Sequence, residues 1–580
     1  MSIPDTILDG NRRLMRVLMP ASLITGRMHK QGIPLSSDVL IWKAEKWKER
    51  ILEKKEELFG LVGHRFNLDS HEQLKDFLYG TKWNKDFSGS WSMDFDVVID
   101  DKTRKITSGQ YALAELHYRY GRCLSCKGVS DACDNCKREG RDRTDKILHI
   151  LREIKLLRHR LSNFVLPFLD WVDCPSCVGD DDDEETEEAK PKKRRSKKDK
   201  FDKGLCPNCG GTGFKQITGH NPRYISIKND WWWMHPTYLQ TPNTLRFACV
   251  DRNIQQFARY LAPFDIHVRD VIVSPPGYML WDYDYSKAER WGAAIIYQSG
   301  SLLEELTDDD AYAKLGSRIF EVPYEQCRKG SPMYPGTKTF VLSTQYQAKI
   351  RTIYRTVLQM CGIALSDDIL KRGTDLIYNQ IHKEFYNNVR EHAWKSYQRG
   401  WAVSAHGALF RIPKDPVLRR YSHWTEIRDK EAWRAFERVC RAVSAFVIQS
   451  TMTGLAAQLM LVKAVDALDK WMKPEWSQYR HLNGNWDLLF PFITKHDELG
   501  FCSRADLAEE GMERLKKEML DFNTWEPLLP SRTDHIKFPL KVEAAGPSRQ
   551  FDTPLPKNHA EMTKAKNPNY YYQDSIMFKK

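Results

Sequence analysis

Two apolar segments that lie far apart in the chain each run directly into acidic residues. Residues 278–285 read YMLWDYDY, and residues 490–493 read FPFI and lead to His496, Asp497 and Glu498. This composition predicts buried strands. A carboxylate at the end of a buried strand costs free energy unless it is paired or binds a metal. Asp284 and Asp497 therefore predict a fold in which two strand ends present carboxylates to divalent cations.

The chemistry that such a pair supports is phosphoryl transfer. Mg²⁺ takes oxygen ligands, usually one or two carboxylates together with substrate phosphates. Two such ions about 3.5–4 Å apart stabilise both the attacking and the leaving oxygen of an in-line displacement. Each segment alone is short enough to arise by chance, so the hypothesis needs further residues in a consistent order.

Length, composition and charge restrict the class of protein. With 580 residues the chain is expected to contain several domains, because single cores seldom grow past about 250–300 residues. A hydrophobic content of 41% excludes a disordered protein, and a net charge of +12 favours a polyanionic partner such as nucleic acid. No long uncharged apolar run and no apolar leader over residues 1–21 are seen, so we expect no membrane span and a cytoplasmic location.

Eight of the 13 cysteines form four Cys-x-x-Cys pairs, which are Cys123/Cys126, Cys133/Cys136, Cys174/Cys177 and Cys206/Cys209. Two thiolates in a tight turn suit a tetrahedral Zn²⁺ ion. The first two pairs predict one four-cysteine site and the last two predict a second, so two structural Zn²⁺ ions are expected. Iron–sulfur binding and a redox role are the alternatives. The other five cysteines are isolated and are expected to be buried as small hydrophobic residues: Cys249, Cys327, Cys361, Cys440 and Cys502.

A block of opposite charges separates the third and fourth cysteine pairs. Residues 180–188 are almost wholly acidic, and residues 190–203 are dense in Lys and Arg. Neither half can bury apolar surface, so residues 179–203 are predicted to form a disordered, solvated loop. Two interpretations stay open, namely that the basic half contacts phosphates or that the two halves compensate each other.

Periodicity gives a coarse secondary structure. Ser37 and Ser70 are candidate N-caps, residues 271–273 (VIV) are a candidate strand, and a helix is expected from Ser286 onward. Helices are also predicted over 14–28, 37–58, 108–120, 143–170 and 505–520, and over most of 305–400 and 428–472.

The acidic segments become specific when they are read with a third segment between them. Residues 284–289 (DYSKAE) resemble motif A of the family A, polymerase I-like DNA polymerases, and residues 496–499 (HDEL) resemble motif C. Residues 338–346 (KTFVLSTQY) resemble motif B, in which a Lys and a Tyr lie eight residues apart on one helix. Further landmarks of the family follow in the same order, and the resemblance covers roughly residues 15–540: 66–74, 242–243, 269–278, 400–413 and 453–460.

The resemblance implies an α+β, right-hand polymerase fold with palm, fingers and thumb. The implied domains are N-terminal helices of the palm that lead into the thumb (1–60), a thumb with two zinc-ribbon-like four-cysteine modules (61–220), palm with motif A (221–300), fingers (301–435), palm with motif C (436–545) and an extended C-terminal tail (546–580). Two roles stay open for the zinc modules in the thumb. They extend its contact with DNA or with a partner, or they only stabilise its structure.

The family's roles transfer to matching positions. Asp284, Asp497 and the backbone carbonyl of Tyr285 would bind two Mg²⁺ or Mn²⁺ ions, with Glu498 as a supporting carboxylate. Lys338 would contact the incoming triphosphate and protonate the leaving pyrophosphate.

The resemblance also assigns the nucleotide pocket and the primer contact. Leu342 would pack on the nucleotide and Tyr346 would stack near the templating base, while Tyr285 and Ser286 belong to the same pocket. Glu289 would close the sugar pocket with Tyr346 against a ribose 2′-hydroxyl. His496 would hold the primer terminus.

Three positions depart from the family pattern. Tyr334 stands where the family has an Arg four residues before the Lys of motif B, Ser343 replaces a Gly, and Thr453 replaces a Gln that reads the minor groove. A tyrosine cannot replace a phosphate-binding guanidinium, so Arg328 or Lys329 is the candidate substitute.

The expected function is template-directed addition of dNTPs to a primer 3′ end, with primer-template DNA and dNTPs as partners. The polymerase-like residues begin near residue 24, so we expect no 3′–5′ exonuclease in this chain and a phage or mobile-element origin. The alternatives are a single-subunit RNA polymerase and a catalytically idle DNA-binding replication factor. A processivity partner could bind the thumb insertion, or a sliding clamp the tail at residues 570–580.

Overall fold

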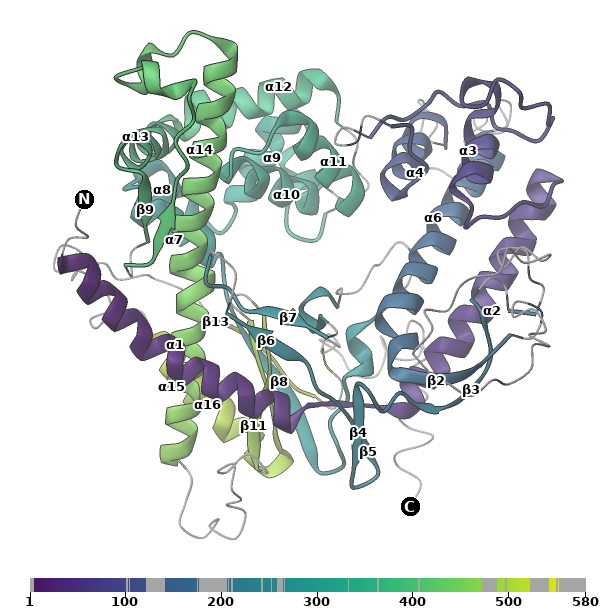
Figure 1. Cartoon of the computed structure of the whole chain (residues 1–580), viewed down its shortest axis with the longest axis horizontal. Coiled ribbons are helices and arrows are strands. Elements are labelled where there is room, and N and C mark those ends of the chain that lie inside the picture. The colour runs from purple at the N-terminus through teal and green to yellow at the C-terminus, as the bar shows by residue number, and fades with distance from the viewer. Residues whose placement is uncertain are drawn as a thin grey trace, which may run out of the picture. The chain divides into compact units, whose positions relative to one another are not determined.

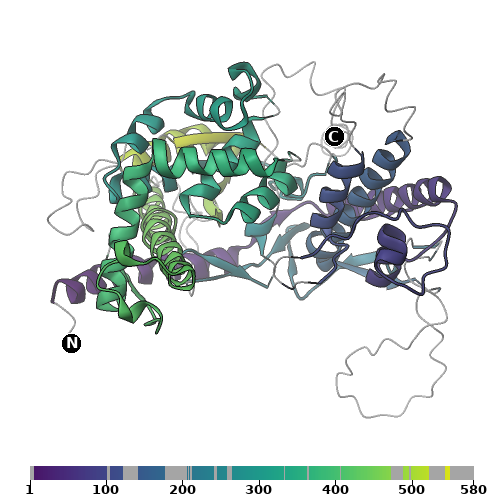
Figure 2. The same ribbon diagram turned by 90° about the horizontal axis from the view of Figure 1, so that it is seen from above.

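The computed structural model of the chain contains two compact units, and each is described by itself (Figures 1 and 2). The first unit comprises Met1–Ser36, Ser226–Arg259 and Arg269–Lys580, and the second comprises Ser37–Ile225 and Tyr260–Val268. The structure describes residues 5–100, 103, 105–121, 141–174, 176, 206, 208–209, 212–240, 244–251, 253–257, 264, 266–331, 333–361, 363, 365–404, 407–471, 488–495, 498–521, 542–548 and 551.

A four-stranded antiparallel sheet in the first unit carries the segment around Asp284. Its strand order is β11-β12-β8-β13. The strands are β8 (Tyr278–Tyr285), β11 (Leu489–Lys495), β12 (Glu498–Arg504) and β13 (Val542–Ser548). The strands predicted at 278–285 and 490–493 are confirmed. Strand β13 was not predicted, because its sequence contains Gly546 and Pro547, which are tolerated here at the edge of the sheet.

Helix α16 (Ala508–Asp521) packs on β8 and on β12 of this sheet. The hydroxyl of Tyr285 donates to the backbone carbonyl of Met519 on this helix at 2.9 Å, and Trp281 stacks on Phe501 with ring centroids 4.6 Å apart. Side chains alternate along a strand. Asp282 and Asp284 therefore lie on the face opposite to Trp281, Tyr283 and Tyr285, and both are half-buried.

The segment that leads into β8 is a turn and not the predicted strand. Residues Arg269–Val271 form a 3₁₀ turn, η7, and Ile272 makes only an isolated bridge with Leu35. Pro275, Pro276 and Gly277 follow, and Pro residues cannot donate to a strand ladder. The apolar residues 271–273 are nevertheless buried, which explains the strand-like sequence signal.

A helical part of the first unit lies between β8 and α14. It contains α7 (Ala288–Ile296), α8 (Gly300–Thr307), α9 (Ala311–Phe320), η8 (Tyr324–Cys327), α10 (Tyr334–Gln345), α11 (Ile350–Cys361), α12 (Asp367–Asp375), η9 (Leu376–Ile381) and α13 (Lys383–Arg399). The hairpin β9 (Trp401–Val403) and β10 (Leu409–Arg411) and the short turns η10 (Leu418–Arg420) and η11 (Trp424–Glu426) follow. The helical prediction over 305–400 is confirmed, and α7 begins two residues after Ser286.

A long helical run connects this part back to the sheet. It consists of α14 (Lys430–Gln449), the π-helical turn η12 (Ser450–Leu455) and α15 (Ala456–Trp471). Helix α14 runs through the boundary predicted at 435/436. Within the described residues, Lys430–Ala467 is the one helix long and apolar enough to cross a membrane, and 75% of its most apolar window is buried in the protein, as in the core helix of a folded domain.

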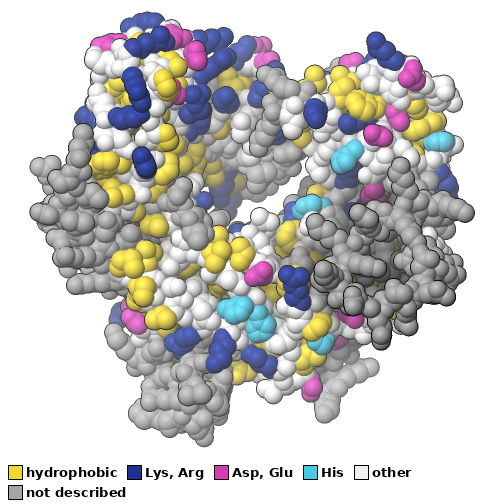
Figure 3. All heavy atoms as spheres, viewed as in Figure 1, with side chains coloured by type: hydrophobic (Ala, Val, Ile, Leu, Met, Phe, Trp, Pro, Cys, Tyr) yellow, Lys and Arg dark blue, Asp and Glu magenta, His cyan; other side chains and the backbone are white. Residues whose placement is uncertain are grey.

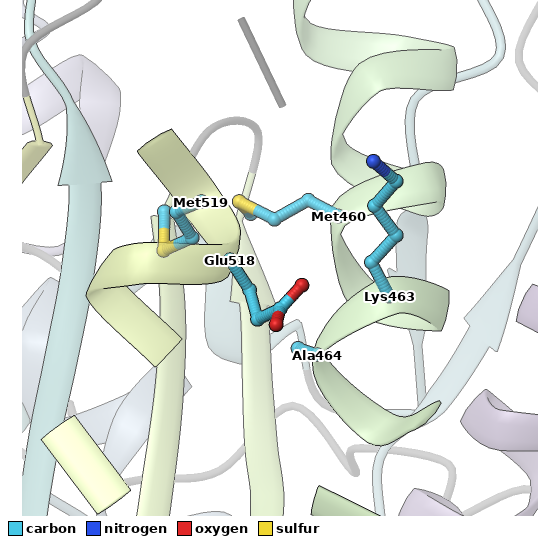
Figure 4. A pocket seen from close by; sticks show the side chains of 5 residues that line it. All are labelled: Met460, Lys463, Ala464, Glu518 and Met519. Atoms are coloured by element: carbon cyan, nitrogen blue, oxygen red, sulfur yellow. The ribbon is translucent and has the colours of Figure 1, made fainter. Parts of the chain in front are cut away.

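A hollow between α15 and α16 has no room for a water molecule. Figure 4 shows Met460 pointing from α15 towards Met519 on α16, with Lys463, Ala464 and Glu518 completing the lining. The hollow is therefore a packing feature of these two helices and not a ligand site.

The remaining elements of the first unit are helix α1 and several short strands. Helix α1 packs on α15, and its range includes the helix predicted over 14–28. Strands β1, β5 and β4 form one small sheet, and β6 pairs with β7. The bounds are α1 (Asp5–Gln31), β1 (Ile33–Leu35), β4 (Ile225–Lys228), β5 (Trp231–Met234), β6 (Thr237–Leu239), β7 (Ala248–Val250), η5 (Ile254–Gln256) and η14 (Ala505–Leu507).

The second unit is built on two long helices. Helix α2 (Ser37–Val62) packs on α6 (Arg141–Phe164), and Arg50 pairs with the buried Glu153 at 2.6 Å. This packing places α2 in the second unit, whereas residues 37–60 are grouped with the N-terminal helices in the domains that the family resemblance implies. The other elements are α3 (His71–Tyr79), η1 (Gly80–Lys82), α4 (Gln110–Leu116), η2 (His117–Gly121), η3 (Leu166–Phe168), β2 (Leu169–Asp173) and β3 (Phe214–His220).

The two predicted N-caps differ in outcome. Ser70 caps α3, since its side chain accepts a hydrogen bond from the backbone N–H of Gln73 at 3.3 Å. Ser37 is already the first residue of α2 and so lies inside the helix. The helix predicted over 143–170 ends at Phe164, because the chain turns through η3 into β2.

Candidate active site

The end of β8 brings two of the predicted acidic residues into register. Asp284 lies directly opposite Glu498 on β12, and Glu543 on β13 occupies the pairing position on the other side. Residues directly opposite each other in an antiparallel pair point to the same face. Asp284 and Glu498 therefore share the face that is not covered by α16.

Glu498 is held in a buried ion pair. Its two carboxylate oxygens accept hydrogen bonds from Arg269 at 2.8 and 3.1 Å, and both side chains are buried. Arg269 also donates to the backbone carbonyl of Phe257 at 3.2 Å. A bidentate ion pair of this kind fixes the orientation of both the guanidinium and the carboxylate. The structure therefore places Glu498 beside Asp284 as a buried partner of Arg269.

His496 and Asp497 lie outside the described residues, but their neighbours on both sides are described. Lys495 and Glu498 pair with each other across β11 and β12, and Glu498 pairs in turn with Asp284. Asp497 is thus covalently next to a residue that lies opposite Asp284 in the sheet.

The described donor atoms suit a hard divalent cation. Asp284 offers a half-buried carboxylate and Tyr285 a backbone carbonyl at the end of the same strand, while the Tyr285 hydroxyl is used on the far face by α16. Oxygen donors of this kind are the ones that Mg²⁺ and Mn²⁺ prefer. The residues present therefore fit the predicted metal.

The chain makes a tight left-handed turn between Asp284 and Glu289. Lys287 adopts φ +58°, and α7 begins at the next residue. This conformation is uncommon for a residue with a side chain and costs of the order of 1 kcal/mol. The turn makes Glu289 the second residue of α7, five residues after Asp284 in the chain.

Glu289 is held on both carboxylate oxygens. The hydroxyl of Tyr346 donates to one oxygen, and Arg246 forms an ion pair with the other. Thr453 lies 3.3 Å from that second oxygen and accepts a hydrogen bond from Arg246 at 2.6 Å. The pair predicted from sequence, Glu289 with Tyr346, is brought together, and Thr453 joins it.

Arg246 is the residue of this cluster that the sequence analysis missed. It follows residues 242–243, which were recognised only as a landmark. Arg246 could have been predicted from the sequence as a cation close to a family landmark, available to pair with the predicted carboxylate of Glu289. A cation there lowers the cost of a partly buried carboxylate such as that of Glu289.

Helix α10 carries the residues of the predicted motif B. Lys338 is exposed on it, and Leu342, one helical turn further on, is half-buried. The helix ends at Gln345, so Tyr346 lies just past it and not within it as predicted. The turn that follows directs the Tyr346 hydroxyl to Glu289.

The cation missing at Tyr334 has a candidate that the sequence analysis did not consider. Tyr334 packs edge-to-face on Tyr312 with ring centroids 6.1 Å apart, and the amine of Lys287 lies 5.6 Å from the centre of the Tyr312 ring. Arg328, which was considered, lies over Tyr324 at 5.9 Å. Lys287 thus lies over a ring that contacts the first residue of α10.

Positive charge gathers on the helices around Lys338. Figure 3 shows Lys and Arg side chains concentrated over α9 to α12 of the first unit. The exposed cations of these helices include Arg318, Lys338, Arg351, Lys371 and Arg372, and Lys349 is exposed just before α11. A surface of this sign attracts phosphates.

In the second unit, three thiols gather at the end of the β2–β3 pair where residues 174–213 connect the two strands. The sulfurs of Cys174, Cys206 and Cys209 lie within 4.8 Å of one another, and all three residues are buried. The Cys174 and Cys206 sulfurs are 3.7 Å apart, close to the edge of a tetrahedron with Zn–S bonds of about 2.3 Å.

Not every predicted cysteine ligand is described. Cys177, the fourth member of this set, and Cys123, Cys126, Cys133 and Cys136 lie outside the described residues. The loop over 179–203 and the tail after residue 551 lie outside them as well, so these expectations stay predictions.

Comparison with solved structures shows that the chain has the fold of a polymerase I-like DNA polymerase domain. One solved structure with this likeness is the POL domain of Pol1 from M. smegmatis in complex with DNA primer-template and dNTP. The TM-score is 0.58 and the sequence identity is 16%, over 92% of this chain and 70% of that chain. No family model and no curated protein matches the sequence.

Proposed function

We propose that the chain is a template-directed DNA polymerase that adds dNTPs to a primer 3′-hydroxyl by two-metal-ion nucleotidyl transfer. The observation that carries the proposal is the Glu289–Tyr346 pair, which lies a few residues beyond Asp284 on a polymerase I-like fold. Asp284 would offer an oxygen ligand to the metal ions, and the Glu289–Tyr346 pair would form one wall of the pocket for the nucleotide sugar.

The residues of the chain would divide the work as follows. Asp284 and the Tyr285 carbonyl, with Asp497, would hold two Mg²⁺ or Mn²⁺ ions, which when bound activate the 3′-hydroxyl and neutralise the triphosphate. Lys338, exposed on α10, would bind the triphosphate and donate a proton to the leaving pyrophosphate. Leu342 and Ser286 would line the nucleotide, and His496 would hold the primer.

Glu289 would exclude ribonucleotides. With both oxygens engaged by Tyr346, Arg246 and Thr453, its carboxylate cannot turn aside to admit a 2′-hydroxyl. The rival function of a single-subunit RNA polymerase requires that hydroxyl to be accepted, so this network favours DNA synthesis. Glu498, paired with Arg269, would support the metal site by orienting the strand end rather than by binding metal itself.

The test is primer extension by the full chain with dNTPs or rNTPs. Replacing Asp284 with Asn should lower the rate at least about 100-fold, because a metal ion contributes several kcal/mol to such a transition state. Asp282→Asn, on the same strand face, is the matched control and should leave the rate within a few-fold. A wild-type chain without dNTP incorporation would support the alternative of an idle DNA-binding factor.

We further propose that Cys174, Cys177, Cys206 and Cys209 hold one structural Zn²⁺ ion and that the remaining two pairs hold a second. The gathering of three buried thiols supports the first assignment. The metal would tie together the connection that joins β2 to β3. A processivity partner and a phage origin remain predictions from the sequence.

A further inference from the structure

Two consecutive residues at the end of α10 hold the same residue of α7. Tyr346 donates from its hydroxyl to the Glu289 carboxylate. Gln345, which is completely buried, donates from its side-chain amide to the Glu289 backbone carbonyl at 3.3 Å. Glu289 is therefore held at both its side chain and its main chain from one point of the neighbouring helix.

Gln345 is itself fixed by a buried ionic chain. Its side-chain oxygen accepts a hydrogen bond from Arg290 at 3.5 Å, and Arg290 forms an ion pair with Glu305 on α8. Glu305 in turn lies 2.7 Å from His382, whose other ring nitrogen is 3.0 Å from the Ser301 hydroxyl. Arg290, Glu305 and His382 are all buried.

The charge state of this chain is consistent with its geometry. Burial by itself would raise the pKa of Glu305, but the positive charge of Arg290 and the hydrogen bond from His382 outweigh it, and the pKa is lowered. Glu305 is thus an anion that anchors Arg290, and Arg290 in turn presents its guanidinium to Gln345.

Packing alone does not account for these polar groups. An apolar side chain of the same volume as Gln345 would fill the space with a smaller desolvation cost. A satisfied buried network instead fixes the relative position of the elements it joins. Here the network joins α7, α8, α10 and the start of α13. It ends at Glu289, the residue that would form the wall of the sugar pocket.

We propose that Gln345 is a positioning residue for sugar discrimination, which sets the place of Glu289 through its backbone while Arg290, Glu305 and His382 fix Gln345. This inference rests on the proposed polymerase function. Loss of the Gln345 hydrogen bond would let the start of α7 relax, so that the Glu289 carboxylate no longer meets the 2′ position at a fixed distance.

The experiment is single-nucleotide primer extension by the full chain, with kcat/KM measured separately for dATP and ATP. We expect Gln345→Met, which removes both hydrogen bonds at similar volume, to lower the dATP/ATP ratio about 5-fold or more. The loss should come from a better kcat/KM for ATP, and dATP incorporation should change less.

Tyr386→Phe is the matched control. It removes a buried hydrogen bond to the backbone carbonyl of Thr344, one residue before Gln345, without touching Glu289. This variant should keep the wild-type ratio within about two-fold. A second test variant, Gln345→Glu, keeps an acceptor for Arg290 but cannot donate to the Glu289 carbonyl, and it should lose discrimination as Gln345→Met does.

The outcomes separate the inference from the function on which it rests. If wild type does not extend the primer, the proposed function fails. If wild type extends it and both Gln345 variants keep the wild-type ratio, or if Tyr386→Phe loses as much, the inference is wrong and the function stands. Thermal melting of each variant shows whether it is folded, and Gln345→Glu decides the question should Gln345→Met not fold.

Discussion

At the scale of single residues, the candidate site depends on how each charge is compensated. Glu498 is neutralised by Arg269, and Glu289 by Arg246. Asp284 stands at the strand end where the oxygen ligands of a cation would gather. The ion pairs of Glu498 and Glu289 suit positioning roles, and the place of Asp284 at the end of β8 suits metal binding.

Lys287 offers a test of how the chain manages without an Arg at Tyr334. If its amine supplies the missing positive charge to the triphosphate, Lys287→Met should raise KM for dNTPs roughly 10-fold and change kcat little, since a hydrogen bond to a charged group contributes about 1.5–3 kcal/mol. Steady-state primer extension measures both constants.

The matched control for Lys287 is Arg328→Met, because Arg328 is the substitute suggested by sequence. Its KM should stay within about two-fold of wild type, as expected of an exposed surface cation. The reverse pattern would assign the role to Arg328 and refute the one given to Lys287.

At the scale of elements, close approach at one glycine shapes the surroundings of Glu289. Gly454 lies in the π-helical turn η12, and a Cβ there would come within 2.2 Å of the backbone carbonyl of Thr244. The absence of a side chain lets η12 approach residues 244–246, which brings Thr453 to Arg246. Helical irregularities of this kind are frequent at functional sites.

Gly454→Ala should therefore destabilise the protein by about 1–3 kcal/mol, because the added methyl group forces backbone movement. It should also lower the dNTP/rNTP ratio, since Thr453 is displaced from Glu289. Gly26→Ala in α1, where a Cβ meets nothing within 4 Å, is the control and should be neutral or stabilise slightly. Thermal melting and primer extension together check both variants.

The β2–β3 hairpin is the element whose state should depend on metal. Elemental analysis of the purified full chain should find two zinc ions per chain, and Cys209→Ser should remove about one of them. Cys249→Ser, at an isolated buried cysteine, should leave the zinc content unchanged. A wild-type content below one zinc per chain would refute the zinc assignment.

At the scale of the whole molecule, stability should carry a pH dependence from the second unit. Burial is the main cause that lowers the pKa of Lys155 to about 8, and the ammonium donates to the Ser108 carbonyl at 2.7 Å. Between pH 8 and 10.5 the unfolded chain binds this proton and the folded chain does not. The free energy of unfolding should therefore rise with pH across that window, by at most roughly 1.4 kcal/mol per unit.

Calorimetry of the full chain between pH 8 and 10 tests this contribution. In Lys155→Met the rise attributable to this group should disappear, whereas Lys146→Met, an exposed lysine on the same helix, should keep it. Equal pH profiles for wild type and Lys155→Met would show that the Lys155 amine titrates normally.

The local sequence predicted those secondary-structure features that depend only on neighbouring residues in the chain. Strand β8 follows from its alternating apolar pattern, and the N-cap of α3 follows from Ser70 three residues before Gln73. The long helices follow from their periodicity. The end of α10 at Gln345 was not foreseen, because a tertiary contact of Tyr346 competes with continuation of the helix.

The sequence by itself determined which chemical groups are available: the carboxylate at the end of an apolar strand, the Lys on α10 and the Tyr just past it, and the paired cysteines. Only the tertiary structure decided which groups compensate one another. Arg269 and Glu498 are 229 residues apart in the chain, and Thr453 and Glu289 are 164 apart. No local pattern can specify such pairs, because their formation depends on how separate elements pack and on which buried charges lie close enough to neutralise each other.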